Sequence, residues 1–221
     1  MPMHRLAVFA LAAIAFATSA GCQTDTPVHI LRERADREFE RNRYAEAADN
    51  YREIAERYPG DWRAQYKLGL ALLETGELVE ARNALEVAYT RQPNNLDVVD
   101  ALAEVMYRQR DDEYLYSFLR QRAERTQSVR SYLRLAEYAR ALGDPDSAVV
   151  AVETAIEISD GQAVEPYIAA AELALELQND ELALRRLRQA YGIDPRNERV
   201  NELLRELGEV PGPTIALPPG R

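Results

Sequence analysis

Apolar and polar residues alternate with a helical period along most of the chain. In the segment 62–95, leucines and alanines recur three or four positions apart on either side of Thr75-Gly76-Glu77, and Pro93 stands near the end. Residues at this spacing share one face of an α-helix, and glycine and proline commonly end helices. The pattern therefore predicts two amphipathic helices that pack together through a short turn.

The same helix–turn–helix pattern recurs at a fixed interval. Pro59, Pro93 and Pro195 stand at the ends of three segments, separated by 34 residues and by three times 34. Gly76 and Gly143 occupy equivalent turns in two of the segments. Repetition at this period is typical of solenoids, in which each helix pair stacks on the next.

The best copy places small residues where its two helices must approach closely and larger apolar residues along the rest of the seam. The small residues are Gly69, Ala81 and Ala88, and the larger ones are Leu68, Leu72, Leu78 and Leu85. At these positions the segment resembles the tetratricopeptide repeat. The resemblance implies an all-α fold, a right-handed superhelical solenoid of about five helix pairs, with repeats at about residues 28–61, 62–95, 96–128, 129–163 and 164–197.

The third copy departs most from the repeat pattern. Leu115 and Arg122 stand where the family has small residues, and no proline ends the copy. Because the apolar residues around them keep helical spacing, we expect a continuous helix with a slightly altered packing angle. After the fifth copy, residues 198–207 carry apolar and charged faces, which predicts a capping helix. Residues 208–221 hold four prolines among glycines, which predicts a flexible or extended tail.

The N-terminal residues carry a different pattern. Arg5 precedes an unbroken apolar run from Leu6 to Ala17, and small residues then lead to Cys22, the only cysteine in the sequence. A run of this length is typical of the core of an export signal and is short for a membrane span. The run Thr18-Ser19-Ala20-Gly21-Cys22 resembles the bacterial lipobox, although Ser19 stands where that family usually has leucine.

The lipobox resemblance implies a signal peptide at residues 1–21, a lipid on Cys22 and a short tether at 22–27. The lipid would be the only membrane anchor. Gln23 stands where the family often has aspartate in proteins retained at the inner membrane, so the resemblance implies the outer membrane, facing the periplasm. The alternative is an ordinary secretory signal cut after Ala20, which would leave a soluble periplasmic binding protein.

Charge and composition narrow the chemistry further. The chain has 27 basic and 37 acidic residues, a formal net charge of -10, and such a surface repels nucleic acid. One cysteine and two histidines leave almost no material for disulfides, zinc sites or histidine-based catalysis. We therefore expect no catalytic residues, no cofactor, no metal, no small-molecule substrate and no nucleic-acid partner.

The tetratricopeptide resemblance implies a concave groove, lined by the first helix of each pair, that holds a partner peptide or helix. The apolar and aromatic candidates gather in the first three copies, with charged residues around them. The candidate groove residues are Phe39, Arg63, Tyr66, Leu70, Leu73, Asp97, Asp100, Glu104 and Tyr107. This composition is typical of protein-binding patches, and its acidity favours a basic or amphipathic partner segment. The alternative for each single residue is packing between neighbouring pairs or an ordinary solvated helix face.

These observations predict a membrane-anchored scaffold of the bacterial envelope that binds protein partners. Relatives of similar size and layout assist outer-membrane protein assembly or act as pilotins for pilus and secretion pores, and the resemblance extends that expectation to this chain. The alternatives are the soluble periplasmic binding protein and a regulatory subunit of an enzyme.

Overall fold

The computed structural model describes residues 26–220, so the predicted signal peptide and lipidation site at Cys22 lie outside it. The described chain is all-helical, with no strand, which confirms the expected fold class. Its elements are α1 (Val28–Glu40), α2 (Tyr44–Arg57), α3 (Trp62–Thr75), α4 (Leu78–Arg91), α5 (Leu96–Arg108), α6 (Asp112–Thr126), α7 (Val129–Ala141), α8 (Pro145–Ser159), α9 (Glu165–Glu176), α10 (Asp180–Ile193), α11 (Glu198–Glu206) and the 3-10 turn η1 (Pro213–Ile215).

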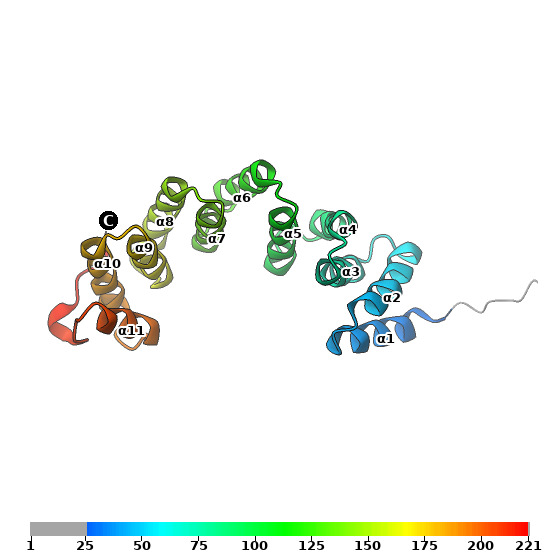
Figure 1. Ribbon diagram of the computed structural model, residues 1–221, viewed down its shortest axis with the longest axis horizontal. Coiled ribbons are helices and arrows are strands. Elements are labelled where there is room, and N and C mark those ends of the chain that lie inside the picture. The colour runs from blue at the N-terminus through cyan, green and yellow to red at the C-terminus, as the bar shows by residue number, and fades with distance from the viewer. Residues whose placement is uncertain (1–25, 221) are drawn as a thin grey trace, which may run out of the picture.

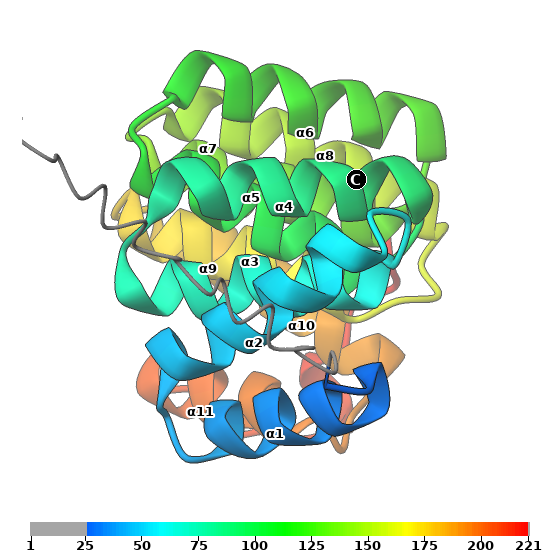
Figure 2. The same ribbon diagram turned by 90° about the vertical axis from the view of Figure 1, so that its right-hand side faces the viewer.

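The helices stack as successive antiparallel pairs along an open arch (Figure 1). The first helices of the pairs lie toward the inside of the arch, most clearly α5 and α7, and the second helices lie outside, most clearly α6 and α8. Figure 2 shows the central helices side by side with nearly parallel axes. No helix among the described residues has the length and apolarity to cross a membrane.

Side-chain caps fix where several helices begin. The carboxylate of Asp61 accepts hydrogen bonds from the backbone amides of Arg63 and Ala64 at the start of α3. Asn95 caps α5 in the same way. Such caps satisfy amides that have no partner within the helix. Asp61 also binds the Arg32 guanidinium of the preceding pair at 2.6 Å, so this cap joins two repeats.

Acid is expected to remove the contribution of Asp61 to stability. Burial alone would raise the pKa of Asp61, but hydrogen bonds from Arg32 and from the two cap amides outweigh burial and lower it. A lowered folded-state pKa gives stability that is present above the unfolded value of about 3.9 and lost as the pH falls through the folded value. At pH 7, Asp61→Asn should lower the free energy of unfolding by about 1 kcal/mol, because asparagine keeps the cap and loses the ion pair.

Urea unfolding of the wild type and Asp61→Asn at several pH values measures this effect. The difference between the two chains should begin to shrink as the pH falls below about 3.9, and it should approach zero only below the lowered folded-state pKa of Asp61, where both side chains are neutral. A difference that stayed constant from pH 7 to the lowest pH at which both chains fold would show that the Asp61 charge contributes nothing.

The second pair shows why small residues occupy the seam. Gly69 of α3 faces Leu85 of α4 so closely that a Cβ on Gly69 would lie 2.4 Å from the Leu85 Cγ. Leu85 is fully buried. Only glycine therefore permits this approach of the two helices. Equivalent seams form one continuous core along the array.

The third pair departs from the others more than expected. Helix α6 is continuous, yet α5 and α6 pack against each other far less extensively than the two helices of any other pair. Arg122, where the family has a small residue, is 5% exposed and donates a hydrogen bond to the Pro93 carbonyl oxygen. The long side chain needs space that a small residue would leave to the neighbouring helix. The sequence predicted a slightly altered packing angle, whereas the structure shows that the two helices of this pair are packed together more loosely.

The C-terminal residues lie against the last pair. Helix α11 buries Val200, Leu203 and Leu204 on α10, as a capping helix requires. The chain then turns back over the outer side of α10, where the Leu217 amide donates to the Arg188 carbonyl oxygen at 3.0 Å. The flexible or extended tail that the sequence predicts is thus an extended segment docked on the array, and the docking itself was not predicted.

Candidate partner-binding face

Five of the predicted groove residues lie together on α3 and α5. Burial, followed by the nearby carboxylates of Asp97 and Asp100, raises the pKa of the Tyr66 phenol. Tyr107 is half-buried, and its ring meets the Tyr138 ring edge-on with centroids 5.7 Å apart. The structure therefore brings Tyr66, Asp97, Asp100, Glu104 and Tyr107 onto one side of neighbouring first helices. We call these five residues the acidic face.

The carboxylates of the acidic face are largely paired. Asp100 binds Arg134 of α7 at 2.5 Å, and Arg134 also binds Glu137 at 2.6 Å. Glu104 binds Arg108 at 2.6 Å and accepts a hydrogen bond from the Tyr138 hydroxyl at 3.3 Å. This pairing weakens the expectation that the face selects a strongly basic partner, because two of its three carboxylates already have cationic neighbours.

The remaining predicted groove residues separate into different environments. Phe39 packs edge-on against Tyr44, with the Lys67 ammonium 4.9 Å from its ring centroid. Arg63 is exposed and stacks over Trp62, and Leu70 is half-buried against the core.

Leu73 corrects the prediction. It is 4% exposed, so it packs within the core and presents no surface to a partner. Leu73 therefore has the alternative environment named for each candidate, packing between neighbouring pairs. The reason is stacking, because the last turn of α3 lies against the next pair, where Arg108 donates to the Leu73 carbonyl oxygen.

A cavity of about 250 Å³ lies between α7, α8 and α9, in the fourth and fifth copies. Its apolar lining comes from Leu133, Ala136, Ala148, Val152, Ala169 and Leu173, and its polar lining from Glu137, Arg140 and Glu172. Small-molecule sites usually enclose about 300–1,000 Å³. This inner-face cavity therefore suits one or two apolar side chains of a bound segment. Within the described residues, no group of three or more acidic, histidine or cysteine side chains is arranged to hold a metal ion.

The predicted groove residues do not include this cavity, since the sequence pattern placed the groove in the first three copies. The cavity exists because alanines at 136, 148 and 169 leave space beside larger residues. Those alanines look like ordinary seam residues of the repeat, so a single sequence gives little signal for the cavity. Arg134 and Tyr138 were also missed, although each stands 34 residues, one repeat, after its acidic partner on the acidic face.

Comparisons with known proteins agree with this architecture. Tetratricopeptide-repeat family models match residues 32–95 and 129–161. No curated protein sequence matches the chain.

Solved structures share the fold at low sequence identity. A crystal structure of MamA is 16% identical, covers 81% of this chain and 94% of its own, and has a TM-score of 0.57. YrrB, described as a TPR protein with an unusual peptide-binding site, is 18% identical over 81% of this chain and 92% of its own, with a TM-score of 0.51. A thermophilic TPR protein of Thermus thermophilus is 21% identical over 82% and 98%, with a TM-score of 0.51. The two family-model matches show that the chain contains tetratricopeptide repeats at residues 32–95 and 129–161, and the repeating helix pairs give it the fold of a tetratricopeptide-repeat solenoid.

Proposed function

We propose that this chain is a scaffold of the bacterial envelope that binds an extended or helical segment of a partner protein on the inside of its arch, and that it is not an enzyme. The observation that carries the proposal is the inner-face cavity, because it offers an apolar floor with charged groups around it on the face where tetratricopeptide proteins receive peptides. A rigid apolar pocket rimmed by polar groups is the usual anatomy of a binding hot spot.

The charges at the rim favour a partner that is amphipathic. Arg140 binds Glu176 at 2.8 Å, and Glu172 binds Arg199 of α11 at 2.8 Å. Both ion pairs are partly exposed and contribute little to stability. A bound partner can therefore break them and pair with the same charged side chains at a small cost in free energy. An apolar anchor would enter the cavity while flanking polar groups of either sign meet these residues. The acidic face on α3 and α5 continues the same side of the array toward the N-terminus.

We expect a photo-reactive phenylalanine analogue at the exposed position 140 to cross-link one envelope partner in cells. The additional substitution Leu133→Asp should reduce that adduct by about tenfold or more, because a carboxylate in the apolar floor would be buried without a partner. Val79, on the outer helix α4 and 73% exposed, supplies the matched control Val79→Asp, which should leave the adduct unchanged. Equal loss of the adduct in both variants would count against the inner face.

We also propose that a lipid on Cys22 anchors the arch to a membrane. The support is the lipobox-like run that ends at Cys22, together with the few residues between it and the start of α1 at Val28. Fewer than ten residues reach at most about 20–30 Å, so the anchored arch would stay close to the bilayer surface. Its partner would then be a protein embedded in or docked on the same membrane, such as an assembly or secretion complex.

Intact mass measurement of the protein from bacterial membranes is expected to show an N-terminus at Cys22 that carries acyl chains. Cys22→Ala should move the protein from the membrane fraction to the soluble periplasmic fraction. An unmodified N-terminus after Ala20 would instead support the soluble alternative and would leave the binding proposal standing.

A further inference from the structure

The last described residues form an extended segment on the outer side of the array, which we call the tail segment (Leu217–Gly220). Backbone hydrogen bonds hold both of its ends. The Leu217 amide donates to the Arg188 carbonyl oxygen at 3.0 Å, and the Gly220 amide donates to the Tyr167 hydroxyl at 3.1 Å. Contacts to the backbone of an extended segment are how many proteins bind peptides.

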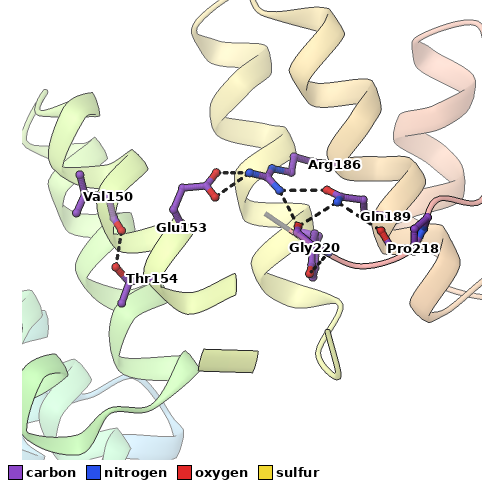
Figure 3. Close-up of polar contacts among 8 residues, drawn as sticks. Val150, Glu153, Thr154, Arg186, Gln189, Pro218 and Gly220 are labelled. Carbon is purple, nitrogen blue, oxygen red and sulfur yellow. Dashed lines mark hydrogen bonds and ion pairs between the residues drawn. The ribbon is translucent and has the colours of Figure 1, made fainter. Parts of the chain in front are cut away.

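Two buried polar side chains of α10 reach the carbonyl oxygen of Gly220 (Figure 3). Arg186, 5% exposed, donates to it at 3.1 Å, and Gln189, 4% exposed, donates at 3.0 Å. Glu153 of α8 holds the Arg186 guanidinium through two bonds of 2.6 and 2.7 Å. Arg186 and Gln189 also bond to each other at 3.1 Å. The donors are thus fixed in place by α8 and α10 and point toward the tail segment.

Two glycines permit the close approach of the tail segment. A Cβ on Gly192 would lie 2.3 Å from the Leu217 carbonyl oxygen, and a Cβ on Gly161 would lie 2.7 Å from the Pro219 ring. Glycine within a helix is less favourable than alanine, because the flexible glycine backbone loses more conformational entropy when it is ordered. Gly192 lies in α10 and is exposed, so packing within the array does not require it, whereas the approach of the tail does.

The tail segment is bound at the surface and does not belong to the core. Residues 216–220 are all exposed, so the segment contributes little apolar burial. A cavity of about 220 Å³ continues the path beside Pro219 and Gly220, and its lining includes the acidic residues Glu157 and Asp160. An acidic cavity at that point suits a basic side chain that follows the glycine.

We propose that this surface is a second binding site, for an extended peptide containing Pro-Pro-Gly followed by a basic residue, and that the tail occupies it within its own chain. The site, which we call the outer cradle, consists of Gly161, Tyr167, Arg186, Gln189 and Gly192. It is separate from the inner-face cavity, because the tail crosses the outer side of α10. A partner segment of this chemistry has to displace the tail. It therefore competes with the effective concentration of the tethered tail at the cradle, which is on the order of millimolar for short linkers.

The test uses the full chain and a fluorescent peptide with the sequence of residues 213–221. In the Pro218→Gly/Pro219→Gly chain the cradle is unchanged, but the free tail gains conformational freedom, so it occupies the cradle less. Fluorescence anisotropy should show saturable binding of the peptide to this chain. The wild type should bind it about tenfold more weakly, because its own tail competes.

Adding Gly192→Ala to the double-glycine chain should abolish peptide binding. Adding Gly212→Ala should not, since a Cβ there would meet only the Val210 carbonyl oxygen, at 3.9 Å. A peptide with glutamate in place of its terminal arginine should bind several-fold more weakly. Absence of saturable binding to the double-glycine chain, or equal binding with Gly192→Ala, would overturn the proposal. Neither result bears on binding at the inner-face cavity, which Leu133→Asp tests separately.

Discussion

Gly69→Ala is expected to lower the free energy of unfolding by about 2 kcal/mol, although alanine is the better helix former. Its Cβ would overlap the side chain of Leu85, and overpacking of a buried seam usually costs about 1–3 kcal/mol. Leu85→Ala should cost more, about 3–4 kcal/mol, because a fully buried leucine leaves a cavity.

The double variant Gly69→Ala/Leu85→Ala should lose at least about 1 kcal/mol less than the sum of the single losses, since the added methyl fills part of the vacated space. Chemical denaturation measures the free energy of unfolding of the two single variants and the double variant, provided that their m-values agree. Gly60→Ala is the control, because its Cβ would meet only Arg91, at 3.8 Å, and it should leave stability nearly unchanged. Strict additivity of the two seam substitutions would show that the cost of Gly69→Ala does not come from overlap with the Leu85 side chain.

Glu153→Ala is expected to lower the free energy of unfolding by about 2–3 kcal/mol. The side chain of Arg186 is only 6% exposed, so removing its carboxylate leaves a buried positive charge with neutral partners only. Breaking a buried ion pair usually costs about 3–5 kcal/mol, and the partial exposure of Glu153 reduces that range here.

The pair Arg140–Glu176 provides the comparison for Glu153→Ala. Both side chains are about half exposed, so Glu176→Ala should change stability by less than about 0.5 kcal/mol. Thermal and urea unfolding of both variants decide the matter. Equally small losses of unfolding free energy for Glu153→Ala and Glu176→Ala would contradict this prediction. They would mean that the Arg186 guanidinium becomes hydrated or rotates to the surface when Glu153 is removed.

The repeating part of the fold could be predicted well because it is local. A period of 34 residues, glycine turns and small seam residues specify helix pairs one at a time, and stacking neighbouring pairs then produces the solenoid. The loosened third pair was underestimated, since the position of Arg122 in the repeat does not reveal that its long side chain is buried and bonded to the Pro93 carbonyl oxygen.

The site was predicted less completely because it depends on contacts between repeats. Leu73 has the periodicity of a groove residue, but the neighbouring pair buries it. One usable signal was present: Asp100 and Arg134 have opposite charge and stand one repeat apart, which predicts an ion pair between adjacent first helices. The docking of the tail had no comparable signal, because backbone atoms make most of its bonds.

The loosened contact between α5 and α6 has a mechanical consequence for the arch. A repeat array carries each local rotation to everything beyond it, so we expect bending of the arch to concentrate at the third pair, between α1–α4 and α7–α11. A small rotation there changes the aperture of the arch while the seams within each arm stay packed. If partners bind inside the arch as proposed, bending at this one pair would adjust the opening to segments of different width.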